Sequence, residues 1–185
     1  MRRGFKAWCE RYSLAQRKEL DLHESDPLDP LRLAEHLGIL VWTVADIPGL
    51  EKKYLDILTK KDSVSWSAAT LCTGDTHLII HNPSHSAGRT NSNLTHEMAH
   101  IICEHKPARV DVSEQGLLIL DSYSKDQEQE ADWFAGCLLL PRPALMYIKS
   151  QGYTTDYATK RYGVSNQMLT YRLRMTGVNK QFGYM

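Results

Sequence analysis

The sequence predicts an α+β fold in which a small antiparallel sheet and several helices form a core, followed by a helix-turn-helix-like C-terminal segment. Two neighbouring stretches, 63–71 and 76–81, have the pattern of a β-hairpin, while most of the remaining chain has helical apolar spacing. Two short helical stretches flank Gly163-Val164-Ser165 near the end of the chain. We expect a core over residues 1–150 and a small helical subdomain over residues 151–185 packed on it.

The composition is that of a soluble globular protein, since 42% of the 185 residues are hydrophobic and 24% are charged. The formal net charge is zero, which gives no general electrostatic argument for binding nucleic acid or membranes. No apolar run approaches the roughly 18 residues that a membrane span needs, and no secretory signal pattern is present. The four cysteines are scattered without a Cys-x-x-Cys pair, so free thiols are expected. These features lead us to expect a cytoplasmic protein.

The first half of the chain alternates helical and strand-like stretches. Asp29 is suited to cap a helix whose first residue is Pro30, and Gly38 is suited to end it. The stretch 63–71 alternates apolar residues with serines, as a half-buried strand does. The elements expected here are a helix over about 5–22, a helix over 31–37, a strand over 39–44, a helix over 50–60, and strands over 63–71 and 76–81.

The second half of the chain is predicted to be mainly helical. The polar stretch 86–93 is expected to be a loop whose last residues are good N-caps for a helix over about 94–104. Lys106-Pro107 is expected to end that helix, and residues 108–124 give no clear pattern. The remaining expected elements are helices over about 125–140 and 143–151 and two short helices within 156–174.

The helix expected over 94–104 contains His96-Glu97-Met98-Ala99-His100, a His-Glu-x-x-His pentad. Residues four apart lie on one face of a helix with Cβ atoms roughly 5–6 Å apart, so both imidazoles can reach one ion. Glu97 can address a water on that ion rather than the ion itself. The pentad therefore predicts a Zn²⁺ site with His96 and His100 as ligands and Glu97 as the catalytic base.

A catalytic zinc held by two histidines needs a third protein ligand. Two nearby candidates fit poorly. Glu104 lies a further helical turn along, about 6 Å past His100. His105 misses by one residue the register of a third histidine six residues beyond the pentad.

The helix expected over 125–140 supplies better candidates. Glu128 and Asp132 share one face with two alanines, which would allow this helix to approach the pentad helix closely. Glu128 is then expected to point at the metal, and Asp132 to accept a hydrogen bond from a ligand histidine and fix its tautomer. Glu130 lies on another face and is the alternative third ligand.

Residues 128–141 read Glu-Gln-Glu-Ala-Asp-Trp-Phe-Ala-Gly-Cys-Leu-Leu-Leu-Pro. Together with the pentad, this block resembles the ImmA/IrrE family of metallopeptidases, in which a His-Glu-x-x-His helix is followed by Glu-Ala-Asn/Asp-x-Phe-Ala and then Leu-Leu-x-Pro. The stretch Asp29–Ile39 adds to the likeness, which covers about residues 28–178. One departure is Met98-Ala99, where the family usually has Leu-Gly, and neither position is a metal ligand.

The resemblance implies a zincin-like metallopeptidase core, bound zinc and proteolysis. Known members of the family cut repressor proteins to switch on phage, mobile-element or stress-response genes. We therefore expect a zinc-dependent endopeptidase whose protein substrate is a helix-turn-helix repressor. If the strand over 76–81 lies at a sheet edge, it is expected to pair with the extended substrate.

A regulatory protein that binds DNA or a repressor through the C-terminal helix-turn-helix, with a structural metal site, is the alternative. Residues 149–185 contain six Lys or Arg against one Asp, which gives this segment a net charge of +5. On this alternative, Arg172 and Arg174 would contact DNA. An isolated helix-turn-helix is weak evidence, and the resembling family has a similar helical segment after its protease core. We therefore favour a packing or partner-docking role for the segment over DNA binding.

Overall fold

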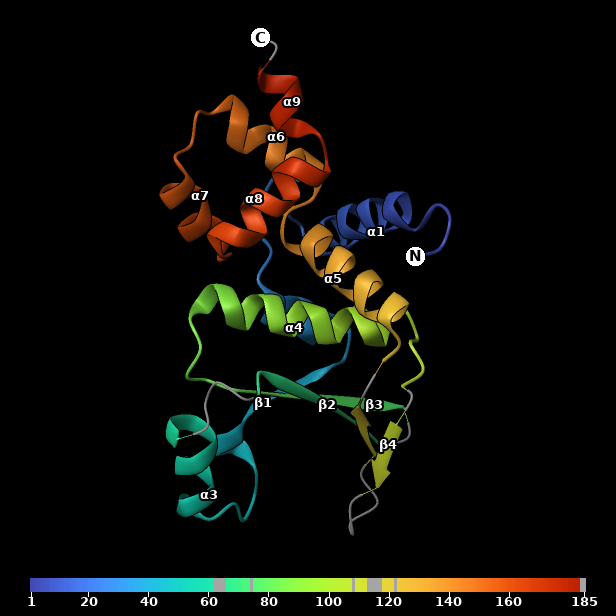
Figure 1. Ribbon diagram of the computed structural model, residues 1–185, viewed down its shortest axis with the longest axis vertical. Coiled ribbons are helices and arrows are strands. Elements are labelled where there is room, and N and C mark those ends of the chain that lie inside the picture. Colours follow the sequence, from blue (N-terminus) through green and yellow to red (C-terminus); the bar gives the residue numbers. More distant parts are fainter. Residues whose placement is uncertain (62–65, 74, 108, 113–117, 122, 184–185) are drawn as a thin grey trace.

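The computed structural model describes residues 1–61, 66–73, 75–107, 109–112, 118–121 and 123–183. In Figure 1 a long helix, α4 (Ala87–Ile102), lies across one face of the sheet. Helices α1 (Phe5–Glu19) and α5 (Lys125–Leu139) lie on the side of α4 away from that sheet. The later helices gather at the end of the molecule farthest from the strands, and they are α6 (Arg142–Ser150), α7 (Thr155–Tyr162), α8 (Asn166–Met175) and α9 (Val178–Gly183). The helices thus cover the sheet in layers, and α4 occupies the middle of the molecule.

The sheet has five described strands in the order β1-β3-β2-β5-β4. Their bounds are Leu40–Thr43 for β1, Ala68–Thr73 for β2, Thr76–His81 for β3, Arg109–Val112 for β4 and Leu118–Asp121 for β5. The predicted hairpin is confirmed, because β2 and β3 are antiparallel partners. Its first strand was expected to begin at 63, and residues 62–65 lie outside the described part of the chain.

Two predictions about the sheet were wrong. The sheet is mixed rather than antiparallel, because β1 runs parallel to β3, with Leu40 opposite Leu78. The alternation of side chains along a strand reports its faces and not its direction, so the sequence pattern could not show this. The strand Thr76–His81 is also not an edge, since β1 and β2 flank it on both sides. Its backbone is therefore already paired and does not offer an edge to a substrate.

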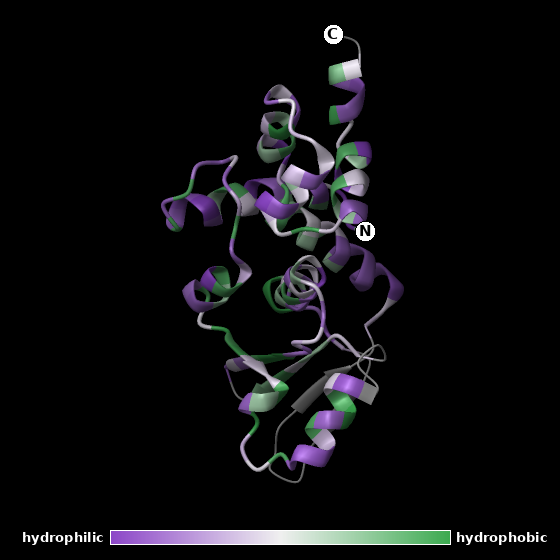
Figure 2. Ribbon diagram, turned by 90° about the vertical axis from the view of Figure 1, so that its left-hand side faces the viewer, coloured by the Kyte–Doolittle hydropathy of each residue, from purple (hydrophilic) through white to green (hydrophobic). Residues whose placement is uncertain are grey.

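The helices largely follow the sequence prediction. Hydrophobic and hydrophilic residues alternate along them in Figure 2, as expected for helices with one buried face. The bounds are Phe5–Glu19 (α1), Pro30–His36 (α2), Val44–Asp46 (the 3₁₀ helix η1), Lys52–Asp56 (α3), Ile57–Lys61 (the π-helix η2), Ala87–Ile102 (α4), Lys125–Leu139 (α5), Arg142–Ser150 (α6), Thr155–Tyr162 (α7), Asn166–Met175 (α8) and Val178–Gly183 (α9). The elements β4, β5 and α9 were not predicted from the sequence.

The loop predicted over residues 86–93 is instead the first two turns of α4. Glycine and small polar residues have weak helix propensity, so these turns depend on a tertiary contact. The contact is with the turn between α7 and α8, where the side-chain amide of Asn91 donates to the carbonyl of Gly163 at 2.9 Å. A Cβ on Gly88 would lie 2.9 Å from backbone atoms of Val164 and Ser165. The missing side chain at Gly88 therefore lets α4 meet this turn.

The two helices predicted around Gly163-Val164-Ser165 are present as α7 and α8. Gly163 ends α7 in the left-handed conformation, with φ of 59°. Ser165 caps α8, because its side chain accepts a hydrogen bond from the backbone of Met168 at 3.1 Å. The pattern that predicted the motif is thus the one that forms it.

The buried apolar residues form two clusters. The first joins α1, α2, α4 and α5 to the sheet, with Leu33, Met98 and Phe134 fully or almost fully buried. The second joins the end of α5 to α6, α7, α8 and α9. The division into residues 1–150 and 151–185 stays a prediction, although α6 belongs to the same apolar cluster as the later helices.

Two buried arginines bind the C-terminal carbonyls of α5. Arg17 of α1 donates to the carbonyl of Leu138 at 2.9 Å, and Arg172 of α8 donates to that of Leu140 at 3.0 and 3.1 Å. Arg172 also pairs with Glu10 at 2.6 Å and is fully buried. The expectation that Arg172 would contact DNA on the alternative function was therefore wrong, because this side chain connects α8 to the core.

None of the four cysteines, all of which the structure describes, forms a disulfide, as predicted. The described part of the chain contains no helix that is long and apolar enough to cross a membrane.

The contact between Gly88 and the α7–α8 turn predicts the effect of one substitution. Gly88→Ala should lower the free energy of unfolding by about 1–3 kcal/mol, because the added methyl group overpacks backbone that cannot move aside. In a solvent-exposed helix the same change would stabilise by about 1 kcal/mol. Urea denaturation checks the sign, with Gly183→Ala as the control, since a Cβ there would meet nothing within 4 Å. A Gly88→Ala protein at least as stable as wild type would contradict the described contact.

Candidate active site

Helices α4 and α5 position the candidate site. His96 and His100 lie one turn apart on α4, while Glu128 lies in the first turn of α5. The start of α5 is fixed by a capping box in which Ser124 and Gln127 exchange side-chain-to-backbone hydrogen bonds of 2.9 and 3.3 Å. The local sequence therefore sets where α5 begins and so where Glu128 lies.

Three predicted site residues meet at one point. The ligand-type atoms of His96, His100 and Glu128 all lie within 4.8 Å of one another. The two Nε2 atoms are 3.0 Å apart, and the carboxylate of Glu128 lies 3.2 Å from Nε2 of His96 and 3.7 Å from Nε2 of His100. The side chain of His100 is only 1% exposed and that of His96 is 24% exposed, so one side of the group is open.

The opposite ring nitrogen of each histidine has its own partner. Nδ1 of His96 lies 3.0 Å from the carboxylate of Asp132, as predicted, and so carries the proton in the neutral ring. Nδ1 of His100 lies 3.0 Å from Nδ1 of His105, whose Nε2 lies 3.4 Å from the carboxylate of Glu130. In the consistent assignment, His105 donates to Glu130 and accepts from His100.

This assignment leaves an unprotonated Nε2 on both His96 and His100, facing each other and the carboxylate of Glu128. Three electron-pair donors this close repel one another unless a cation lies among them. The donor set, two imidazoles and a carboxylate with one open side, is the set that catalytic zinc sites use. The three residues therefore fit a metal ion.

The pKa values of the two metal-site histidines are shifted in opposite directions. Burial, together with the neighbouring His96 and His105, lowers the pKa of His100 to about 3, so this imidazole is uncharged at neutral pH. Burial also lowers the pKa of His96, but Asp132 and the nearby carboxylates outweigh this effect and raise the pKa overall. Because Asp132 stabilises a positive ring, it also makes the neutral ring a more basic donor.

The carboxylate of Glu97, the residue after His96, forms a contact with the sheet. The hydroxyl of Thr70, which is fully buried on β2, donates to a carboxylate oxygen of Glu97 at 2.5 Å. Burial raises the pKa of the Glu97 carboxyl, while the Thr70 hydrogen bond and His96 work in the other direction. A carboxylate with a raised pKa is better able to accept a proton at neutral pH than an exposed one. Nothing in the sequence around Thr70 predicted this contact.

Glu130, the alternative third ligand, lies elsewhere. Its side chain is 6% exposed and forms a bidentate contact with Arg2, whose guanidinium nitrogens lie 3.0 to 3.2 Å from the carboxylate oxygens. Burial raises the pKa of the Glu130 carboxyl, but the bonds from Arg2 outweigh this effect and lower the pKa overall. The structure thus places Glu128, and not Glu130, beside the two histidines.

The contact between His105 and His100 was not predicted, because His105 was considered only as a metal ligand. After α4 ends, Glu104 adopts a left-handed conformation with φ of 52°, and the chain turns so that the backbone of His105 donates to the carbonyl of His100 at 3.0 Å. Helical spacing does not apply beyond such a turn, and a glutamate gives no signal for it. Tyr123 stacks on the ring of His100, with ring centroids 3.7 Å apart.

Comparison with known proteins agrees with this geometry. Residues 50–174 match the Peptidase M78 family, described as the IrrE N-terminal-like domain. The chain belongs to this family. It is therefore a member of a metallopeptidase family, and the matched region contains His96, His100 and Glu128, the group that can hold a metal. The resemblance read from the pentad and the second block is thus confirmed.

A solved structure shares the fold of this M78 protein. It is described as a Mycobacterium tuberculosis transcriptional regulator, with a TM-score of 0.50 and 16% sequence identity. The match covers 93% of this chain and 47% of the other, so the chain spans about half the length of that regulator. Among curated proteins, none matches this chain.

Proposed function

We propose that this M78 protein is a zinc-dependent endopeptidase that cuts a transcriptional repressor and thereby controls phage, mobile-element or stress-response genes. The observation that carries the proposal is the convergence of His96, His100 and Glu128 at the meeting of α4 and α5, with Glu97 beside it. Family membership supports the peptidase reaction. The repressor substrate rests on the sequence resemblance. We propose a cytoplasmic location because a transcriptional repressor acts there.

The metal would be held by His96, His100 and Glu128. Two neutral imidazoles and one carboxylate are the donors of many catalytic zinc sites, and the exposed side of His96 leaves a position for water or substrate. Bound zinc would polarise the scissile carbonyl and lower the pKa of a bound water to about 7.

Glu97 is proposed to act as the general base. Its carboxylate takes a proton from the attacking water and passes it to the leaving amine. The hydrogen bond from Thr70 holds one carboxylate oxygen of Glu97 and so limits the rotation of the side chain next to His96. The raised pKa of Glu97 suits a group that must both accept and release a proton.

His105 and Asp132 are proposed as positioning residues. Each binds Nδ1 of one histidine and so keeps the Nε2 lone pair directed at the metal position. Glu130 and Arg2 extend the contact on the His105 side and hold that ring in place. Outer partners of this kind commonly change metal affinity by about 10–100-fold when removed.

The DNA-binding alternative is less well supported. Arg172, one of the two arginines expected to contact DNA, is buried and paired with Glu10. In addition, residues of α8 face α4 and α5 across a cleft, whereas a recognition helix must present its face to a major groove.

The role proposed for Glu97 predicts that its substitution abolishes cleavage without loss of zinc. Glu97→Gln should abolish cleavage of a repressor encoded next to this protein, since the amide cannot accept the water proton, while zinc content stays unchanged. Co-expression of the two proteins, followed by detection of the repressor fragment, measures this. Glu104→Gln, an exposed change two residues past the end of α4, is the matched control and should cut normally. Equal fragment yields from wild type and Glu97→Gln would refute the assigned role.

The positioning role of His105 predicts weaker metal binding. His105→Ala should lower zinc affinity by about 10–100-fold, because the His100 ring loses the partner of its Nδ1. Competition with a chromogenic chelator measures the affinity without any substrate. His36→Ala, which changes an exposed histidine at the end of α2, serves as the control. Unchanged affinity in His105→Ala would show that His105 does not position the ligand.

A further inference from the structure

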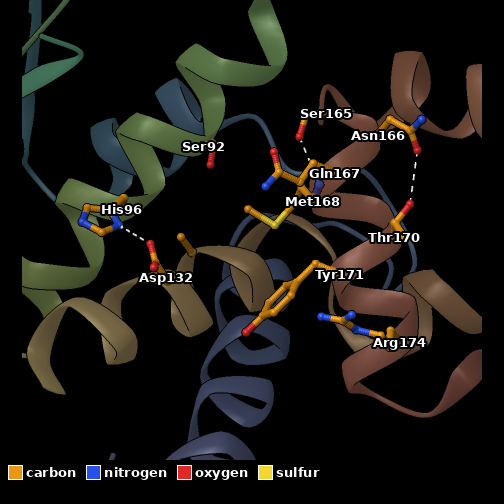
Figure 3. A pocket seen from close by; sticks show the side chains of 11 residues that line it. Ser92, His96, Asp132, Ser165, Asn166, Gln167, Met168, Thr170, Tyr171 and Arg174 are labelled. Atoms are coloured by element: carbon orange, nitrogen blue, oxygen red, sulfur yellow. Dashed lines mark hydrogen bonds and ion pairs between the residues drawn. The ribbon is translucent and has the colours of Figure 1, made fainter. Parts of the chain in front are cut away.

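A cleft of about 740 Å³ begins at the candidate site and extends to the second helix of the helix-turn-helix. Its walls come from α4, α5 and α8. His96 and Asp132 line it at one end, and Arg174 lines it from the last turn of α8. Figure 3 shows Gln167, Met168 and Tyr171 on the side of α8 that faces His96 and Asp132. The cleft therefore reaches the proposed metal site at His96 and at Asp132, the partner of that histidine.

The size of the cleft limits what it can hold. Clefts of roughly 300–1,000 Å³ bind small ligands or short segments of a chain. Duplex DNA, whose major groove must receive a whole helix, cannot enter the space between α8 and the two core helices. A few residues of an extended polypeptide suit it better.

The lining has the chemistry of a peptide subsite. Gln167, Tyr171 and Arg174 offer side-chain donors and acceptors, and Tyr171 adds an aromatic ring that packs edge-on against Trp133 at 6.4 Å. An extended peptide has free backbone amides and carbonyls that need such partners. Most of the cleft-facing residues of α8 are polar and exposed, although their helix packs in the second apolar cluster through Leu169.

The charge of the cleft is asymmetric. Of the described residues that line it, Asp132 is the sole carboxylate, and it is engaged by His96. Arg174 is exposed and forms no ion pair with any described residue, in contrast to the neighbouring Arg172. An uncompensated guanidinium at a peptide-sized cleft favours a carboxylate, which it can bind through two parallel hydrogen bonds.

We propose that α8 forms a substrate-recognition wall, and that Arg174 selects an acidic side chain in the polypeptide segment bound next to the cut site. This rests on the proposed endopeptidase function and adds the substrate class. The helix-turn-helix then serves to read a protein substrate rather than DNA. This role of α8 also accounts for the contacts of Gly88 and Asn91 with the turn before α8. These contacts hold the turn against α4, and the recognition wall must keep a constant position relative to the histidines.

Binding of short synthetic peptides tests the proposal. The full chain with Glu97→Gln, supplied with Zn²⁺, is applied to arrays of neutral polar peptides that have one Glu, Gln or Lys at each position in turn. Glu peptides should bind about five-fold more tightly than the matched Gln peptides. The preference should weaken at roughly 0.5 M salt, because the pair is exposed to solvent.

Reversing the charge of Arg174 in the Glu97→Gln protein tests whether this residue causes the preference for acidic peptides. Adding Arg174→Glu should reverse the preference to Lys peptides, whereas adding Lys180→Glu, the same charge change at an exposed residue of α9, should leave it unchanged. Absence of an acidic preference, or a preference that both variants share, would overturn the proposal. The proposal would also be overturned if the Arg174→Glu change abolished retention of the protein on duplex DNA and left the peptide preference unchanged.

The outcome is separable from that of the proposed function. If no Glu97-dependent cleavage exists but the peptide preference follows Arg174, the endopeptidase function fails and the recognition wall stands. If cleavage depends on Glu97 while peptide preference ignores Arg174, the function stands and the wall is wrong.

Discussion

The packing of α4 against α5 is the contact on which the site depends. Ala99 on α4 and Ala131 on α5 are both fully buried, and their small side chains allow the two helices to lie close together. At that separation, the ligand-type atoms of the two histidines on α4 and of Glu128 on α5 lie within 4.8 Å of one another. A larger residue at either alanine would push the two helices apart and so increase the distances between the metal-binding atoms, although all three metal-binding residues would still be present. The small side chains at these two positions therefore set the geometry of the site.

Around this contact, each proposed functional side chain is held by an element different from its own. Thr70 on β2 holds Glu97, Asp132 on α5 holds His96, and His105 beyond the end of α4 holds His100. Because α4 lies between the sheet and α5, contacts from both layers orient its functional side chains. These contacts satisfy the Nδ1 atoms of the two histidines and one oxygen of Glu97, and a buried polar atom without a partner would cost stability.

The sequence predicted those parts of the site that follow helical spacing. The spacing of the pentad placed His96 and His100 on one face of their helix. The spacing of four residues between Glu128 and Asp132 indicated which face of α5 lies toward that helix. It could not predict His105, because a left-handed residue after the helix end breaks the spacing, or Thr70, because its contact with Glu97 comes from the stacking of a strand under a helix. The first turns of α4 were missed for a similar reason. Glycine and asparagine are poor helix formers, and their helix forms against the α7–α8 turn, which lies about seventy residues away in sequence. The direction of β1 was equally hidden, since strand patterning reports faces only.

The central claim is that His96, His100 and Glu128 together bind zinc. Zinc affinity of Glu128→Gln, compared with wild type and with Glu130→Gln, tests it most directly. Wild type should bind zinc tightly, and Glu130→Gln should lose no more than the roughly 10–100-fold expected of an outer partner. Glu128→Gln should lose more than that, because it removes a donor from the metal itself. A wild-type protein without zinc affinity, or a Glu128→Gln protein that binds zinc as tightly as wild type, would contradict the account.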